Sequence, residues 1–148
     1  MIDTAPTALL LKTPPADWQD SVVLDYDARL LRRKLLTSTG GTAFLVDLPS
    51  VTNLDEVWGF AVDDAHIRIQ PADEAVLVIT GDLPRLAWHI GNRHTPCQIL
   101  PDRLIIREDH VLEAMLRGLG ASITRAAQPF TPEGGAYGHG RTMGHSHT

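Results

Sequence analysis

The hydrophobic pattern changes its period near residue 74, and this change most constrains the fold. Before it, short apolar runs are separated by Gly, Pro and Asp, which is typical of β-strands. After it, a continuous apolar run at 75–80 precedes one helical face, spaced i, i+3, i+4 and i+7: Leu83, Leu86, Ala87 and Ile90. We therefore expect an all-β domain, residues 1–72, followed by an α+β domain that begins at residue 73.

The two parts also differ in charge. Residues 1–74 carry 6 Lys and Arg against 12 Asp and Glu, a net of −6, whereas residues 75–148 carry 7 against 6, a net of +1. Six of the seven histidines lie in the second part. The formal net charge of −5 argues against general nucleic-acid binding, which requires a basic face.

Cysteine content and hydrophobic run lengths indicate the compartment. The single cysteine, Cys97, cannot form an intrachain disulfide, which fits a reducing compartment. No apolar run has the length of a signal segment or of a membrane span. We expect a cytoplasmic protein that does not bind a membrane.

The first domain reads as a small β-barrel or sandwich. Its expected strands cover residues 21–25, 43–48, 57–62 and 66–70, with Pro49 closing the second and a hairpin turn at 63–65. The basic cluster Arg32-Arg33-Lys34 has two open interpretations: a solvated strand edge that discourages aggregation, or a contact for an acidic partner surface. Residues 71–73 are the expected linker.

The second domain has the order strand, helix, strand, strand, helix, strand. Strands are expected at 75–80, 97–100, 103–107 and 121–124, and Asp82 and Asp109 are candidate N-caps of the two helices. Gly91 or Asn92 can end the first helix in a left-handed conformation. The second helix has an expected apolar face: Val111, Leu112, Met115, Leu116 and Leu119. This order predicts a ferredoxin-like βαββαβ domain at residues 73–127.

Residues 128–148 form a C-terminal tail. The periodicity stops after Arg125, and the Gly-rich composition predicts a flexible segment that lacks order without metal. His139, His145 and His147 lie on it, and a mobile backbone can bend them onto an ion held elsewhere. A purification remnant or a solvated end is the alternative, although the mixed sequence does not look like a designed tag.

His94 is the candidate anchor of a metal site. The stretch 91–94, Gly-Asn-Arg-His, places its imidazole just past the expected helix end, and imidazole suits Ni, Cu and Zn. A lone loop histidine is usually only a solvated residue, and it cannot complete a four-coordinate site. A twofold interface, however, would bring two copies of His94 face to face.

Other potential ligands have competing interpretations. His110 with Glu108 and Asp109 can form a weaker secondary site, or equally a helix cap with exposed polar neighbours. Cys97 is expected to be a small buried hydrophobe outside the site. The two remaining histidines, His66 and His89, are expected at the surface.

No catalytic constellation stands out. The chain has no P-loop and no Gly-rich dinucleotide turn after the 75–80 strand, and no serine or cysteine triad order is evident. A metal-dependent hydrolase would need a general base, for which Asp109 or Glu108 is the local candidate. We expect a protein that is not an enzyme.

These residues resemble a known family. The motif 88–94, Trp-His-Ile-Gly-Asn-Arg-His, with the following Pro96, Gln98 and Ile99, resembles the signature of UreE, the urease accessory nickel metallochaperones. Residues 109–112, Asp-His-Val-Leu, and the segment from Gln128 to Tyr137 extend the resemblance. It is specific from Val76 to Tyr137 and weak before Arg32.

The resemblance implies a homodimer that holds Ni²⁺ at its interface. His94 would bind the ion, His145 and His147 would complete the site, and His139 and His110 carry less weight. The N-terminal β domain is likened to a peptide-binding chaperone module in this family. The nickel would pass toward the urease apoprotein–accessory complex with the accessory GTPase of the same pathway.

This chain departs from parts of the family pattern. It has three tail histidines where some members have many, which implies storage of few ions. Some members carry a histidine at the position of Glu108, so one donor of a secondary site near His110 is missing.

The sequence thus predicts a nickel carrier for urease maturation. Zn²⁺ or Cu²⁺ can substitute, since the usual affinity order places Cu²⁺ ahead at imidazole sites. The alternative is a protein-binding accessory module in which the β domain and the basic cluster recruit partners, with incidental Zn²⁺ or Cu²⁺ binding.

Overall fold

The computed structural model describes residues 4–134. The chain divides into two compact units, with the boundary between Ala72 and Asp73. The fold is mixed α+β, as predicted, and consists mostly of strands with two α-helices. Among the described residues, neither helix is long and apolar enough to cross a membrane.

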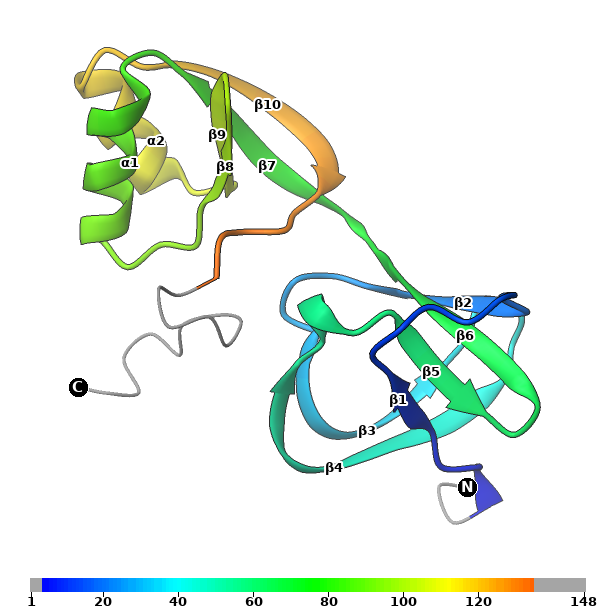
Figure 1. The fold of residues 1–148 in the computed structure, drawn as a ribbon. Helices are drawn as coiled ribbons and strands as arrows, with labels where there is room; N and C mark the ends of the chain where they lie inside the picture. The colour runs from blue at the N-terminus through cyan, green and yellow to red at the C-terminus, as the bar shows by residue number, and fades with distance from the viewer. Residues whose placement is uncertain (1–3, 135–148) are drawn as a thin grey trace. The chain divides into compact units, whose positions relative to one another are not determined.

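Unit 1 contains two β-sheets (Figure 1). One has the strand order β1-β5-β6-β2, in which β2 and β6 are parallel, and the other is the antiparallel pair β3-β4. The strands are β1 (Leu9–Leu11), β2 (Asp20–Leu24), β3 (Leu30–Thr37), β4 (Ala43–Asn53), β5 (Gly59–Val62) and β6 (Ala65–Pro71). A short 3₁₀ turn, Leu54–Glu56, joins β4 to β5.

The core of unit 1 lies between these sheets. Phe44 and Val46 alternate inward along β4 and are completely buried, as are Phe60 of β5 and Ile67 of β6. The rings of Phe44 and Phe60 lie 5.3 Å apart between centroids and join the two sheets. Two sheets that share one apolar interior agree with the expected small barrel or sandwich.

Three details of unit 1 differ from the sequence prediction or refine it. Strands β1 and β3 were not among the expected strands. Strand β4 does not stop at Pro49: its pairing with β3 is interrupted between Asp47 and Thr52, and proline is tolerated in such an irregular stretch because no ladder bond is required there. The predicted hairpin turn is confirmed, with Asp63 in a left-handed conformation at φ 51°.

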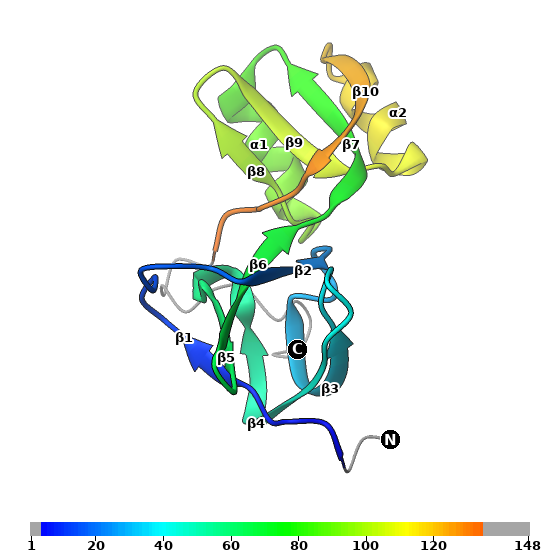
Figure 2. The ribbon, with the colours of Figure 1, turned by 90° about the vertical axis from the view of Figure 1, so that its right-hand side faces the viewer.

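Unit 2 has the predicted ferredoxin-like order. Its elements are β7 (Asp73–Thr80), α1 (Leu83–Asn92), β8 (Gln98–Leu100), β9 (Arg103–Arg107), α2 (His110–Gly118) and β10 (Ser122–Pro129). The four strands form an antiparallel sheet in the order β10-β7-β9-β8, so the two βαβ halves interleave. Both helices cover the same face of this sheet (Figures 1 and 2).

The core of unit 2 lies between the helices and the sheet. The buried cluster includes Leu77 and Ile79 from β7, Leu104 and Ile106 from β9, Leu86 and Ile90 from α1, and Leu112 and Leu116 from α2. Because strand side chains alternate, Val76 and Ile105 project from the opposite face. Both are nevertheless completely buried.

Two element boundaries in unit 2 were predicted imperfectly. Strand β10 is twice as long as the expected 121–124 strand, and it pairs with β7 through Gln128 and Pro129, which the sequence placed in the tail. Val111 is 54% exposed and is not part of the apolar face of α2, because it precedes Leu112 by one helical step of about 100°.

Candidate metal centre

The end of α1 determines the position of His94. Asp82 caps the helix, accepting a hydrogen bond from the Arg85 amide at 3.4 Å, and buried Leu86 and Ile90 fix the helix against the sheet. At the other end, the Arg93 amide donates to the Ile90 carbonyl at 3.1 Å. The loop that follows therefore starts from a firmly packed helix.

His94 itself makes the left-handed turn, with φ 57°. Its amide donates to the Gly91 carbonyl at 2.9 Å, and the side chain is exposed. The sequence assigned the left-handed residue to Gly91 or Asn92, and this was wrong because α1 continues through Asn92. A left-handed conformation is uncommon for a residue with a Cβ, although histidine is enriched there.

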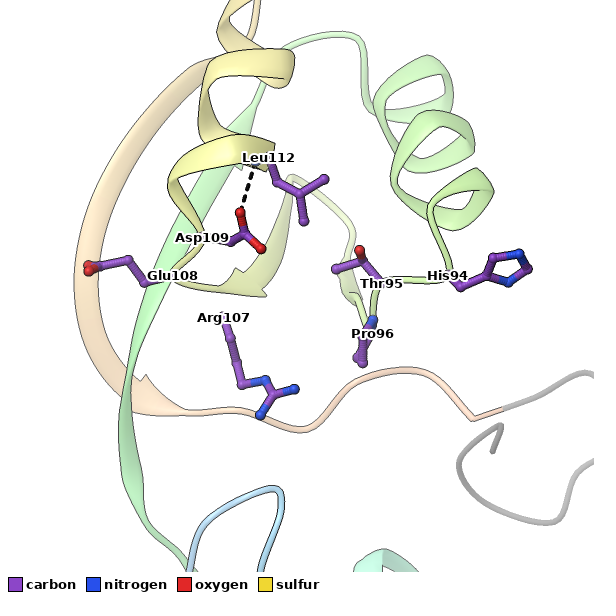
Figure 3. Close-up of a pocket in the computed structure, with 7 residues that line it drawn as sticks. All are labelled: His94, Thr95, Pro96, Arg107, Glu108, Asp109 and Leu112. Carbon is purple, nitrogen blue, oxygen red and sulfur yellow. Dashed lines mark hydrogen bonds between the residues drawn. The ribbon is translucent and has the colours of Figure 1, made fainter. Parts of the chain in front are cut away.

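His94 borders an open cavity of about 380 Å³. The cavity is lined by His94, Thr95, Pro96, Arg107, Glu108, Asp109 and Leu112. Figure 3 shows the imidazole of His94 pointing away from Glu108 and Asp109. The two carboxylates therefore share a cavity wall with His94 without converging on its ring nitrogens.

Asp109 acts as a helix cap. Its Oδ1 accepts hydrogen bonds from the amides of Val111 at 2.9 Å and Leu112 at 3.0 Å (Figure 3 shows the latter). The Oε2 atom of Glu108 lies 3.9 Å from Nη1 of Arg125. His110 begins α2, is exposed and does not line the cavity. The cap interpretation of this segment is thus confirmed, while a secondary metal role of His110 stays a prediction.

Cys97 has the character of a buried thiol. Burial raises its pKa to about 11, with a further contribution from the nearby Glu133 carboxylate, against a lowering by the Ile105 backbone. Its side chain packs partly against the core of unit 2. A thiol of this kind is a poor metal ligand at neutral pH because the thiolate is the binding form.

The described part of the chain does not complete a metal site. Within residues 4–134, no group of three or more His, Cys, Asp or Glu side chains is arranged to hold an ion. The other predicted ligands, His139, His145 and His147, lie outside the described residues. Within the described residues, His94 is therefore an exposed potential donor that does not belong to a group of three or more such side chains.

Two residues near His94 were missed by the sequence reasoning. Arg107 lines the cavity from the end of β9, and Gln98 at the start of β8 accepts a hydrogen bond from the Thr131 amide at 3.1 Å. The alternation of β9 is a sequence signal that could have placed Arg107 on the face opposite the helices. No comparable signal indicated the partner of Gln98, since residues 98 and 131 are distant in sequence.

Family models match parts of both units of the chain. Residues 74–148 match the family model for the C-terminal domain of the UreE urease accessory protein, and residues 4–56 match the model for its N-terminal domain. The two matches together include unit 2 from residue 74 onward, with the His94 loop, and unit 1 up to residue 56.

Individual relatives are similar over most of their length. The urease accessory protein UreE of Rhodobacter capsulatus is 61% identical over 138 residues, covering 90% of this chain and 88% of the relative. The UreE proteins of Paracoccus denitrificans and Cereibacter sphaeroides are each 58% identical, covering 90% and 85% of this chain and 86% and 70% of the relatives. The family consists of accessory proteins and not of catalytic enzymes, which confirms the prediction that this chain is not an enzyme. The chain therefore belongs to the UreE family of urease accessory proteins.

Proposed function

We propose that this chain is a nickel carrier that delivers Ni²⁺ for the maturation of urease. The observation that carries the proposal is the exposed His94, held in a left-handed turn at the end of α1 in a protein of this accessory family. Imidazole is a suitable ligand for Ni²⁺, and an exposed donor allows the ion to be passed on. Nickel is here the cargo of the protein.

The ligand count supports a shared site. A single imidazole binds a divalent ion weakly, and residues 4–134 offer no further converging donors. A homodimer with His94 near its twofold axis supplies a second imidazole, since an isologous interface presents the same residue twice. His145, His147 and His139 of the tail are the proposed additional ligands, and His110 is a weaker candidate.

The proposed partners follow from the same role. Delivery to urease requires contact with the urease apoprotein and its accessory complex, and the proposed route includes the accessory GTPase of this pathway. We place this transfer in the cytoplasm, and the proposal involves neither nucleic acid nor a membrane.

Nickel titration calorimetry tests the anchor. We expect His94→Ala to lower the affinity at least tenfold and to change the number of ions bound per dimer. A chain truncated after residue 137 should lose affinity more moderately, because it keeps both copies of His94. His66→Ala is the matched control, since His66 lies in unit 1 and its ring is 3.2 Å from the Asp17 carbonyl oxygen. Unchanged affinity in His94→Ala would refute the anchor assignment.

The pH dependence provides a second test. Metal binding requires neutral imidazole, so nickel affinity should fall as the solution is acidified. Competition with Zn²⁺ and Cu²⁺ should show both ions substituting, with Cu²⁺ strongest, because the site offers ordinary imidazole donors. A nickel affinity that does not change when the solution is acidified would exclude a histidine site.

A protein-binding role of unit 1 is the second candidate. Three residues of β3 are exposed: Arg32, Arg33 and Lys34. Within the described residues, the Nε atom of Arg33 lies 3.9 Å from Oδ2 of Asp47, which is a long ion pair. An acidic partner surface fits this basic cluster. Co-precipitation of urease accessory components that is indifferent to nickel and to His94→Ala, but lost on charge reversal of the cluster, would favour this role.

A further inference from the structure

The chain after β10 crosses the sheet of unit 2. Strand β10 lies at one edge of the sheet and β8 at the other, because the order is β10-β7-β9-β8. Beyond β10, the Thr131 amide donates to Gln98 Oε1 at 3.1 Å, and the Glu133 amide donates to the Cys97 carbonyl at 2.9 Å. Residues 130–133, which we name the strap, therefore join opposite edges of the sheet.

The strap lies on the face that the helices leave uncovered. Gln98 is paired with Ile105, and directly paired residues in an antiparallel sheet project from the same face. Ile105 alternates with Leu104 and Ile106 of the helix-facing core, so Gln98 and its hydrogen bond to the strap belong to the opposite face. The strap thus passes over the face that contains Ile105.

Burial along the strap alternates as expected for an extended segment. Phe130 and Pro132 are buried, whereas Thr131 and Glu133 are exposed. Three inter-strand spacings of about 4.8 Å give a width of about 14 Å. The four residue steps from Pro129 to Glu133 span about 14 Å when extended. The strap has almost no slack, so its end point is fixed.

This crossing places Glu133, which we call the root of the histidine-bearing part of the tail, beside the His94 loop. Cys97 follows His94 by three residues, so their Cα atoms are at most about 11 Å apart. The hydrogen bond from Glu133 to Cys97 adds about 5 Å between Cα atoms. The six residues from Glu133 to His139 can span about 20 Å, more than the resulting limit of about 16 Å. His139 can therefore reach His94 in the same chain.

We propose that the strap is a positioning element, with Gln98 as its latch, that holds the root of the histidine tail next to His94. The inference rests on the proposed nickel function for its biological meaning, but the positioning itself needs no metal. Gln98 supplies one of the strap's two hydrogen bonds, and complete release of the strap from Gln98 and from the Cys97 carbonyl would leave the tail tethered at Pro129, on the far edge of the sheet. Its path to His139 would then lengthen from six residues to ten.

The expected effect follows from effective concentration. The effective concentration of a tethered group falls roughly as the −3/2 power of the tether length, which gives about a twofold loss from lengthening alone. Displacement of the root by the width of the sheet lowers it further. We expect Gln98→Ala to reduce the tail's occupancy near His94 by about two- to fivefold.

A metal-free proximity measurement tests the latch. A nitroxide spin label is attached to the cysteine introduced by His139→Cys. The background is Cys97→Ala, which removes the native thiol and keeps the backbone carbonyl of residue 97. The paramagnetic relaxation enhancement is then measured at the Thr95 amide. Gln98→Ala should reduce the enhancement at least twofold. Gln98→Glu should restore it, because a carboxylate oxygen still accepts from the Thr131 amide. Gln70→Ala, an exposed glutamine of β6, is the matched control.

Two outcomes would overturn the proposal. Equal enhancement in the Gln98→Ala and parent proteins would show that the latch does not position the tail. Loss of enhancement in Gln98→Glu equal to that in Gln98→Ala would mean that the hydrogen bond is not the cause.

A nickel titration of Gln98→Ala is a separate experiment, and we expect it to show two- to fivefold weaker binding. Failure of all nickel binding would refute the proposed function without affecting the proximity result.

Discussion

The left-handed conformation of His94 predicts an unusual response to glycine. A residue with a Cβ pays about 1–2 kcal/mol for this conformation, while glycine adopts it freely. Glycine also costs about 0.5–1 kcal/mol through the greater freedom of the unfolded chain. With φ 57° at His94, the conformational gain exceeds the entropic loss. We expect His94→Gly to be more stable than His94→Ala by about 0.5–1 kcal/mol.

Asn92 provides the matched control. It is exposed and lies in the last turn of α1, so its backbone is helical. There glycine should be less stable than alanine by about 0.5–1 kcal/mol. Because the unfolded-state cost of glycine is the same at both positions, the difference between the two Gly/Ala pairs isolates the left-handed penalty of about 1–2 kcal/mol.

Urea unfolding of the metal-free protein measures this difference. The indole NMR signal of Trp88, on α1, reports the transition of unit 2 separately from the tryptophans of unit 1. With a slope of about 1 kcal/mol per molar urea, the midpoints of His94→Gly and His94→Ala should differ by about 0.5–1 M. Equal midpoints, or the same sign of difference at His94 and Asn92, would refute the reasoning. A stabilised His94→Gly that fails to bind nickel would indicate that histidine is kept there at a cost in stability.

Three further predictions concern the surroundings of the site. Asp109→Ala should lower the stability of unit 2 by about 1 kcal/mol in thermal melting, because two hydrogen bonds from backbone amides at the start of α2 are lost. An Asp109→Ala protein with unchanged thermal stability would contradict the cap assignment. Glu113 is paired with Arg117 and Arg125, and these pairs hold its pKa below the ordinary value. The stability that Glu113 contributes is therefore present above the ordinary glutamate range and lost as the pH falls through the lowered pKa, so Glu113→Gln should flatten the acid side of a urea-midpoint profile. The pKa of Cys97, raised from 9.0 to about 11, implies alkylation about 100-fold slower than for an ordinary thiol at pH 8, and Cys97→Ala should leave nickel affinity unchanged; rapid alkylation of the folded protein would contradict the burial of this thiol.

Local sequence signals predicted most elements of unit 2 because they act over a few residues. The apolar periodicity of α1 and the N-caps Asp82 and Asp109 were recognised, and both caps are made in the structure. The order of elements was sufficient for the ferredoxin-like topology, since few chain paths satisfy two interleaved βαβ units. The position of His94 just beyond α1 also followed from the sequence.

Boundaries that depend on pairing were less predictable. The second half of β10 carries no clear apolar alternation, and its extension to Pro129 is decided by its partner β7. Strand β4 likewise passes Pro49, because it pairs with β3 on both sides of the irregular stretch that contains this proline. In both cases, hydrogen bonds to a neighbouring strand outweigh the local signal for a strand end.

The sequence by itself determined the two-part organisation, the helix caps and the position of His94 just beyond the first helix, because each depends on residues close together in the chain. Only the tertiary structure decided that His94, and not Gly91 or Asn92, takes the left-handed turn, because α1 continues through Asn92. It also decided that the chain after β10 returns across the sheet to Gln98. That contact joins residues 33 positions apart, and it exists because four strands first set the width that the strap must cross.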